Sequence, residues 1–288
     1  YLKDKSSKYE CLIVTDLIWI RENVDFSYLE NRLKDVKIPI VLMSVGLQSP
    51  ENKIDFKLHD SVIRILKRVQ ETSVIGVRGE YTEKILNNNG IYNTQVIGCP
   101  SMYYWNDRNY KIKNEDCQID AIGNFRTFYN NKPLTKNETE FIRFLKKWNC
   151  PFVEQTSERL VPSLLSDDKD THELCNYVNR MSAFYYSNKE WIDAIKKFNF
   201  SIGSRFHGNV MGIRAGFKSL FLITDSRTEE MTSFFNLPSL KIENFDSGKP
   251  MSYYYELADY SDFNKYYPNL FDEFDKFIQK NGMKIKDE

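Results

Sequence analysis

The stretch Phe200–Thr224, FSIGSRFHGNVMGIRAGFKSLFLIT, decides the fold class of this sequence. It opens with a short apolar run that ends at Gly203, and it closes with a second apolar run over Ser219–Thr224. Between these runs, Gly208–Ala215 fits a helix that Gly216 stops. A strand, a helix and a second strand in this order indicate the βαβ unit of a parallel sheet.

The same alternation of strands and helices continues on both sides of this stretch. Further strands are expected at Cys11–Thr15, Ile38–Val45, Ser73–Val77, Thr94–Ile97, Ile119–Ile122 and Pro151–Glu154. Further helices are expected at Tyr28–Val36, Ile54–Val69, Glu80–Asn88, Glu138–Trp148, Thr171–Met181 and Lys189–Phe198, and from Ser226, where Glu229 completes a capping box. The polar segment Asn106–Asp116 has no apolar periodicity and is the predicted linker. We therefore expect an α/β fold of two Rossmann-like domains facing a cleft, residues 1–112 and 113–288.

Composition excludes several classes of protein. The 288 residues carry 40 Lys+Arg and 40 Asp+Glu, and this neutral balance argues against a nucleic-acid binder. A hydrophobic content of 41% argues against disorder, and no apolar run has the length of a transmembrane helix. Five scattered cysteines without a CxxC pair and three dispersed histidines predict neither a disulfide framework nor a metal site. We expect a cytoplasmic protein.

The C-terminal tail carries an apolar stripe at helical spacing. The stripe is formed by Phe263, Tyr267, Leu270, Phe274 and Phe277. We interpret it as core packing rather than membrane contact. Peripheral association with the inner face of the membrane stays open, and the sequence does not reveal the oligomeric state.

Two predicted strands end in a similar way. Ile75-Gly76-Val77-Arg78 and Ile202-Gly203-Ser204-Arg205 both lead from a strand into a helix. In open α/β sheets, ligands bind beyond the carboxyl ends of the strands. Although a lone arginine at a strand end is often in a surface ion pair, its planar guanidinium also binds carboxylate or phosphate through two parallel hydrogen bonds. The pattern predicts a site for a small, highly charged anion.

The second strand end is the richer of the two. Arg205 and His207 flank the start of a helix, whose N-terminus favours anions, and Gly208 has no side chain to obstruct a close anion. Arg227 follows the next strand and is expected at the same sheet edge. Only His207 among the three histidines stands in such a setting, so it is the candidate acid or base.

Together these segments resemble a known family. Residues 204–209 (SRFHGN), Gly216 and residues 224–227 (TDSR) are similar to the C-terminal signature of the polysaccharide pyruvyl transferases. Residues 75–82 (IGVRGEYT), residues 98–101 (GCPS) and Gly46 resemble the N-domain signature of that family. The resemblance covers about residues 10 to 240, and it implies a two-domain architecture similar to GT-B glycosyltransferases.

The resemblance also implies an activity. Members transfer a pyruvyl group from phosphoenolpyruvate to two hydroxyls of a sugar, forming a ketal and releasing phosphate. The implied acceptor is a sugar or lipid-linked oligosaccharide of a cell-surface polysaccharide. Phosphoenolpyruvate is a co-substrate here, and neither a cofactor nor a metal is expected. The first domain is expected on the acceptor side and the second, ending in the tail helix, on the donor side.

Site residues are carried over by position. The implied donor-binding residues are Arg78, Arg205, Phe206, His207, Gly208 and Arg227. Arg205 and His207 are also the expected catalytic residues, with His207 as acid or base and the arginines stabilising the departing phosphate. Asp16 and Asp225 are candidate bases on the acceptor side, and the sequence does not decide between them.

Two features depart from the family pattern. Arg227 stands where some members have lysine, and because arginine does not lose its proton, anion binding is favoured over acid catalysis there. The glycine-containing first strand-and-loop unit of the family is not visible. Either the chain is truncated or its acceptor side has diverged, so the first domain is expected to be incomplete.

Other functions stay open. A nucleotide-sugar glycosyltransferase of similar fold would also need cations at helix N-termini, and it would bind UDP- or GDP-sugars instead of phosphoenolpyruvate. A catalytically inactive scaffold in a polysaccharide pathway would bind neither ligand. A dinucleotide-dependent redox enzyme is disfavoured because no GxGxxG motif is present.

Overall fold

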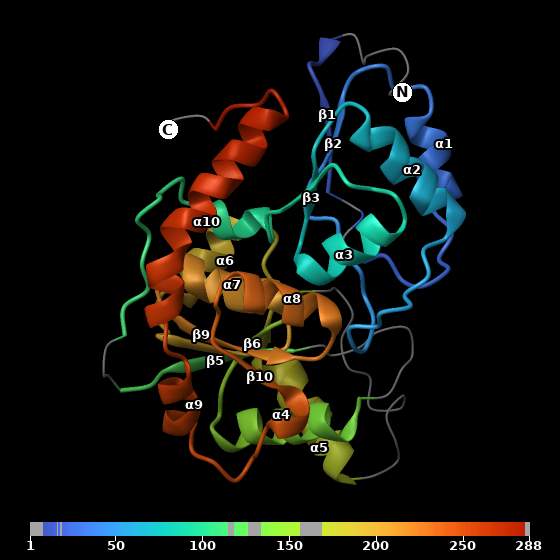
Figure 1. Cartoon of the computed structure of the whole chain (residues 1–288). Helices are drawn as coiled ribbons and strands as arrows, with labels where there is room; N and C mark the ends of the chain where they lie inside the picture. The colour runs from blue at the N-terminus through green and yellow to red at the C-terminus, as the bar shows by residue number, and fades with distance from the viewer. Residues whose placement is uncertain are drawn as a thin grey trace. The chain divides into compact units, whose positions relative to one another are not determined.

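A computed structural model describes residues 8–15, 17, 19–114, 118–125, 134–155 and 169–285 (Figure 1). The chain divides into two compact units. Unit 1 contains Tyr1–Tyr110, Asp225–Asn236 and Tyr266–Glu288, and unit 2 contains Lys111–Thr224 and Leu237–Lys265. Each unit combines helices with parallel strands, so the predicted α/β class with two Rossmann-like units is confirmed.

The strands among the described residues of unit 1 are short and all paired in parallel. They are β1 (Leu12–Val14), β2 (Ile40–Leu42), β3 (Ile75–Val77) and β4 (Thr94–Val96). β1 pairs with β2 and β3 pairs with β4, and a parallel bridge between Val45 and Val77 joins the two pairs. The helices of this unit are α1 (Ser27–Leu33), α2 (Asp60–Gln70), α3 (Glu80–Asn88), α8 (Ser226–Phe234) and, from residue 266 onward, α10 (Ser261–Lys280).

The two faces of β3 pack against different helices. Ile75 and Val77 are fully buried and belong to the core formed with α1, α2 and α3. Gly76, which lies between them, points to the other face, where a Cβ would stand 2.9 Å from Phe277 of α10. This alternation is what a strand covered on both sides requires, because successive side chains point in opposite directions.

The apolar stripe of the tail lies in the core of the protein. Tyr267, Phe274 and Phe277 are all buried on α10. The ring of Tyr103 stacks on Phe274 with a centroid distance of 4.1 Å, and the Tyr267 hydroxyl donates to the carbonyl of Met102 at 2.9 Å. The prediction of core packing for this stripe is therefore confirmed. Among the described residues, no helix is both long and apolar enough to cross a membrane.

Unit 2 contains a six-stranded parallel sheet in the order β10-β9-β8-β5-β6-β7. The strands are β5 (Ala121–Asn124), β6 (Phe152–Val153), β7 (Ser182–Ala183), β8 (Phe200–Gly203), β9 (Lys218–Ile223) and β10 (Ser239–Lys241). The helices are α4 (Lys136–Lys147), α5 (Lys169–Met181), α6 (Asn188–Ile195), α7 (Phe206–Arg214) and α9 (Met251–Leu257). The quoted stretch thus forms β8, α7 and β9, as predicted.

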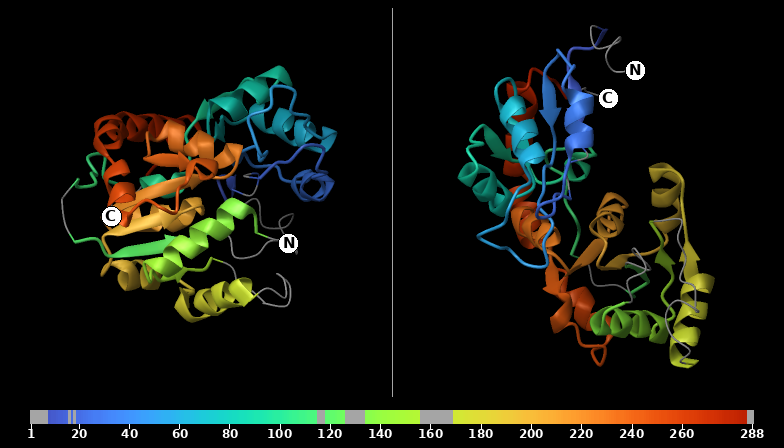
Figure 2. Two further views of the ribbon diagram at one scale, coloured as in Figure 1. Left: turned by 90° about the horizontal axis from the view of Figure 1, so that it is seen from below. Right: turned by 90° about the vertical axis from the view of Figure 1, so that its right-hand side faces the viewer.

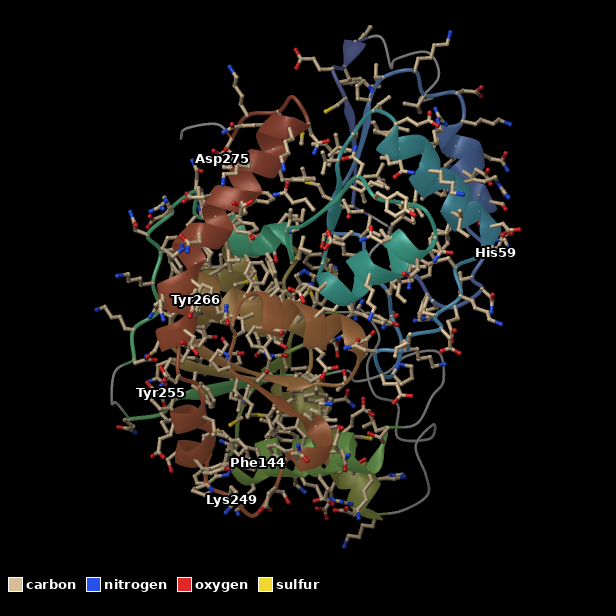
Figure 3. The ribbon with its side chains drawn as sticks, viewed as in Figure 1. His59, Phe144, Lys249, Tyr255, Tyr266 and Asp275 are labelled. Carbon is tan, nitrogen blue, oxygen red and sulfur yellow. The ribbon has the colours of Figure 1, made fainter. Side chains whose placement is uncertain are left out.

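Helices cover both faces of this sheet (Figure 2). Met211 of α7 and Ile195 of α6 pack with Ile122 of β5 on one face. On the other face, Leu145 of α4 lies directly over Gly123, where it would meet an added Cβ at 2.5 Å. Phe144, labelled in Figure 3, lies edge-on to Tyr254 of α9 and closes the core on the α4 side.

The structure groups two segments differently from the predicted boundaries of 1–112 and 113–288. Asp225–Asn236 and Tyr266–Glu288 belong to unit 1, although both were expected in the second domain. For α8 the reason lies in its first turn. The backbone N–H of Ser226 donates to the carbonyl of Ser49 at 2.9 Å, and the N–H of Ser49 donates to the Ser226 hydroxyl at 3.1 Å.

Other differences concern element bounds. The helix expected from Ile54 begins at Asp60, where His59 takes the N-cap position. The strand β7 (Ser182–Ala183) is not among the expected strands, because two residues are too few to give a period-2 signal. How the two units face one another stays a prediction.

Candidate functional site

Arg205 stands between β8 and α7 in unit 2. It occupies the N-cap position of α7 in an extended conformation, and its side chain does not cap the helix. Its backbone N–H donates to Oδ1 of Asn124 at 3.0 Å. Arg205 is half-buried, whereas His207 in the first turn of α7 is exposed. The first turn of a helix carries N–H groups without intrahelical partners, so this end of α7 favours an anion.

A buried amide network lies beneath this turn. Nδ2 of Asn124 donates to Oδ1 of Asn209 at 2.7 Å and to the Ser201 hydroxyl at 3.1 Å. Nδ2 of Asn209 in turn donates to the carbonyl of Gly203 at 2.8 Å. Asn124 is 2% exposed and Asn209 is fully buried. Satisfied polar groups in such a setting fix their neighbours, because breaking any one bond leaves a buried polar atom unpaired.

The structure revises the reason for Gly208. An added Cβ at this position would lie 2.5 Å from Cγ of Asn124. The missing side chain therefore makes room for Asn124, not only for an anion as the sequence suggested. A glycine is needed at position 203 for the same reason, because a Cβ there would come within 1.7 Å of the Asn124 carbonyl oxygen.

Phe206, also expected to bind the donor, is a core residue through its side chain. It is 7% exposed and its ring lies 5.3 Å from that of Phe221 on β9. The ring of His207 meets Phe206 edge-on at 5.6 Å. Phe206 therefore supports His207 from below, and only its backbone can face a ligand.

Arg78 follows β3 in unit 1 and is 2% exposed. Its Nε donates to the hydroxyl of Ser44 at 3.0 Å and to the carbonyl of Ser44 at 3.2 Å. Gly46 lies under the side chain, because a Cβ there would stand 2.5 Å from Cδ of Arg78. The backbone N–H of Arg78 donates to the carbonyl of Val45 at 2.9 Å. The two hydrogen bonds of its Nε to Ser44 fix the plane of the guanidinium.

Arg227 and Asp225 lie in the same unit as Arg78. Oδ1 of Asp225 caps α8 by accepting from the N–H of Thr228 at 2.8 Å. Oδ2 of Asp225 accepts from Nε2 of Gln48 at 3.0 Å and lies 3.5 Å from a terminal nitrogen of Arg227. The sequence placed Arg227 at the edge that carries Arg205, whereas the structure groups it with Arg78 in unit 1.

Charge and burial act on Arg78 together. The pKa of Arg78 is lowered to about 10, chiefly by burial and to a smaller extent by the nearby positive charge of Arg227. Cys99, Glu230 and Asp225 act in the opposite direction. Arg78 nevertheless stays protonated at neutral pH. Two cations and a carboxylate thus share one electrostatic cluster at the carboxyl ends of the strands of unit 1.

Glu230 is a further charged group in this cluster, and no sequence motif selects it. Its carboxylate accepts from the backbone N–H of Thr82 at 2.6 Å and from the Thr82 hydroxyl at 2.8 Å, so it caps α3 from outside. Gly79, the N-cap residue of α3, leaves the space, since a Cβ there would meet Glu230 at 2.8 Å. Burial raises the pKa of Glu230 to about 7, against the hydrogen bonds to Thr82.

The remaining candidate, Asp16, lies outside the described residues. His59, labelled in Figure 3, caps α2 by accepting from the N–H of Ser61 at 3.3 Å, and His172 is exposed on α5. Among the described residues, no group of three His, Cys, Asp or Glu side chains could hold a metal ion. The expected absence of a metal or cofactor stays a prediction.

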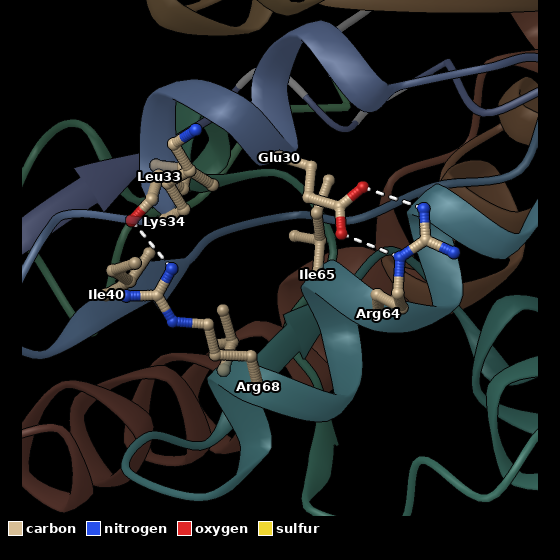
Figure 4. Close-up of a pocket in the computed structure, with 8 residues that line it drawn as sticks. Glu30, Leu33, Lys34, Ile40, Arg64, Ile65 and Arg68 are labelled. Atoms are coloured by element: carbon tan, nitrogen blue, oxygen red, sulfur yellow. Dashed lines mark hydrogen bonds and ion pairs between the residues drawn. The ribbon is translucent and has the colours of Figure 1, made fainter.

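A cavity of about 130 Å³ lies between α1 and α2 in unit 1 (Figure 4). Its arginines already have protein partners. Arg64 forms two hydrogen bonds with Glu30, at 2.7 and 2.9 Å, and Arg68 donates to the carbonyls of Leu33 and Val36, both at 2.7 Å. We interpret this cavity as a packing feature that ties α2 to the end of α1.

Comparisons with known proteins add a family match. The model of the polysaccharide pyruvyl transferases matches residues 16–226. Solved structures similar to this chain include S. aureus MnaA with UDP, at 9% identity and a TM-score of 0.48 over 100% of this chain and 82% of that one. Another is Anabaena HepE with UDP and glucose, at 10% identity and a TM-score of 0.45 over 97% and 76%. A comparison with curated proteins found no match.

Proposed function

The chain belongs to the polysaccharide pyruvyl transferase family, and from that premise we propose that it transfers the pyruvyl group of phosphoenolpyruvate to two hydroxyls of a sugar. The product is a cyclic ketal, and inorganic phosphate is released. The acceptor is a sugar, free or lipid-linked, of a cell-surface polysaccharide. The proposed setting is cytoplasmic, which fits the reduced thiols of Cys11, Cys150 and Cys175.

The proposed reaction needs an acid, a base and stabilisation of negative charge. A proton adds to the methylene carbon of the enol phosphate, and positive charge develops at the neighbouring carbon. One sugar hydroxyl attacks that carbon, the carbon–oxygen bond to phosphate breaks, and the second hydroxyl closes the ring. The two sugar hydroxyls each lose a proton. One of these protons replaces the proton that the acid gave to the methylene carbon, and the other leaves with phosphate.

The start of α7 is the observation that carries this proposal. Within three residues it offers Arg205 at the N-cap, the exposed ring of His207 and the N–H groups of the first helical turn. A guanidinium and a helix N-terminus suit the carboxylate and phosphate of the donor. His207, which is exposed in the first turn of α7, is the proposed acid or base.

Unit 1 contributes further cations to the proposal. Arg78 and Arg227 are proposed to bind donor oxygens and to stabilise the phosphate as it leaves. Asp16 and Asp225 are both proposed as acceptor-side bases; the Asp225 side chain is half-buried, and its Oδ2 lies 3.5 Å from a terminal nitrogen of Arg227. Asp225 also caps α8, so it is held in one orientation.

Phosphate release from phosphoenolpyruvate in the presence of sugar acceptors tests the proposal. The wild-type protein is expected to release phosphate only when an acceptor is present. His207→Ala should lower turnover about 100-fold or more while retaining donor binding, and Arg205→Ala should weaken donor binding. His59→Ala is the matched control, because that ring caps α2. Wild-type turnover in His207→Ala would remove the acid–base assignment.

A further inference from the structure

We infer that Asn124 is a positioning residue for Arg205: its buried side chain, on the strand next to β8, sets the place from which Arg205 meets the donor. The inference rests on the proposed function. It adds a residue that lies outside both signature segments and 81 positions before Arg205 in the chain.

Asn124 binds two consecutive residues of the turn that carries the arginine. Its backbone carbonyl accepts from the N–H of Ser204 at 3.0 Å, and its side-chain Oδ1 accepts from the N–H of Arg205 at 3.0 Å. Asn124 pairs with Gly203 in the register of β5 and β8, so it stands beside the point where β8 ends. One residue therefore determines where the chain leaves the strand and where α7 begins.

The amide of Asn124 can take only one orientation. Its Nδ2 donates to Oδ1 of Asn209, whose own Nδ2 donates to the carbonyl of Gly203. A carbonyl only accepts, so the Asn209 amide must present nitrogen to Gly203 and oxygen to Asn124. Asn124 must then present its nitrogen to Asn209, which leaves Oδ1 for the N–H of Arg205.

The surroundings allow no second arrangement. Asn124 is 2% exposed, Ser201 is 1% exposed and Asn209 is fully buried. Both Gly203 and Gly208 would clash with Asn124 if they carried a Cβ. A side chain enclosed in this way keeps its rotamer, and its hydrogen bonds cannot be replaced by water without opening the core.

The consequence for the arginine is geometric. Arg205 precedes α7 with an extended backbone, at φ −89° and ψ 111°, so a change at its N–H redirects the whole side chain. Displacement of a substrate-positioning group by about 1 Å can cost about two orders of magnitude in rate. The network thus acts on donor affinity through Arg205, without touching the donor.

The test compares Asn124→Ala with Ser201→Ala. Both variants remove the hydrogen bond between Nδ2 of Asn124 and the Ser201 hydroxyl, but only Asn124→Ala also releases the N–H of Arg205. Calorimetric titration of phosphoenolpyruvate is expected to give a Kd raised about tenfold, the equivalent of 1.4 kcal/mol, for Asn124→Ala. Ser201→Ala is expected to bind within about threefold of wild type even though its melting temperature falls. Turnover at saturating donor should change less than KM in Asn124→Ala.

Further variants keep the inference falsifiable. If Asn124→Ala does not fold, Asn124→Ser replaces it. The affinity of Asn124→Ser for phosphoenolpyruvate should also be lower than that of Ser201→Ala. Equal affinities for the position-124 and position-201 variants would overturn the positioning role. Arg205→Met is the reference for full loss of the arginine. A wild-type protein that does not bind phosphoenolpyruvate would overturn the proposed function and this inference together, whereas unchanged binding in the folded position-124 variant alone overturns only the inference.

Discussion

Arg78 and Arg205 end similar four-residue sequences, yet different groups accept their backbone N–H. The N–H of Arg78 donates to the main-chain carbonyl of Val45 at 2.9 Å, and its Nε also donates to the hydroxyl of Ser44 at 3.0 Å. The N–H of Arg205 donates instead to a side chain, the Oδ1 of Asn124, at 3.0 Å. Arg78 is almost fully buried and Arg205 is half-buried. A repeated sequence therefore fixes where an arginine stands in a fold but not which groups position it.

The N-termini of the helices that follow the two arginines also differ. Gly79 is the N-cap residue of α3, whose first turn donates to the carboxylate of Glu230 from α8. Arg205 is the N-cap residue of α7, whose N-terminus is the proposed anion site. One helix N-terminus is thus occupied by the protein's own carboxylate, and the other is proposed to receive the carboxylate or phosphate of a substrate.

Substitutions of Gly203 and Gly79 are expected to give the largest difference in stability between the two turns. Gly203→Ala should destabilise the protein by about 4 kcal/mol or more, because its Cβ would meet backbone at 1.7 Å. Gly79→Ala should cost less, about 2 kcal/mol, because its Cβ would meet side-chain atoms of Glu230, at 2.8 Å, instead of backbone. Chemical denaturation of both variants measures the difference. Equal losses would mean that the two turns are equally rigid.

The pH dependence of the free energy of unfolding reports on Glu230, whose buried carboxyl group caps α3. Its pKa is raised from an ordinary 4.5 to about 7 by burial, so its contribution is fully present below pH 4.5 and is lost as pH rises through 7. Wild type should therefore lose about 3 kcal/mol relative to Glu230→Gln as pH rises across this range. Denaturant titrations at several pH values measure this. Parallel profiles for the two proteins would contradict the buried cap.

Lysine substitutions test whether the more buried arginine, Arg78, contributes more to donor binding than Arg205. Arg78→Lys places an ammonium where burial disfavours charge and where the Nε contact to Ser44 is lost, so KM for phosphoenolpyruvate should rise about 100-fold. Arg205→Lys keeps a half-exposed cation, and its KM should rise about tenfold. Steady-state kinetics on both variants tests the order. The reverse order would show that burial does not set the importance of these two cations.

The smallest expected effect concerns the hydroxyl that orients Arg78. Ser44→Ala removes the 3.0 Å hydrogen bond from Nε but leaves the bond to the carbonyl of the same residue. KM for phosphoenolpyruvate should rise about threefold. Ser49→Ala is the control, because it removes a hydroxyl that donates to the carbonyl of Glu51 instead of accepting from Arg78. A rise in both variants would assign the effect to general loosening of the segment after β2.

The sequence predicted the elements with strong local patterns. β8, α7 and β9 were found because apolar runs and Gly216 mark their limits within 25 residues. Glu230 and Asn124 were not found, since their partners lie 148 and 81 positions away and neither belongs to a periodic pattern. The place of α8 in unit 1 has the same cause, because the contacts between Ser226 and Ser49 span 177 positions.

The identity of the donor is the central claim. Calorimetric titration of the wild-type protein with phosphoenolpyruvate, and separately with UDP-glucose, tests it most directly. The account predicts that phosphoenolpyruvate binds, that Arg205→Met abolishes this binding, and that UDP-glucose gives no heat of binding. Binding of UDP-glucose without binding of phosphoenolpyruvate would contradict the account and would indicate a nucleotide-sugar glycosyltransferase instead.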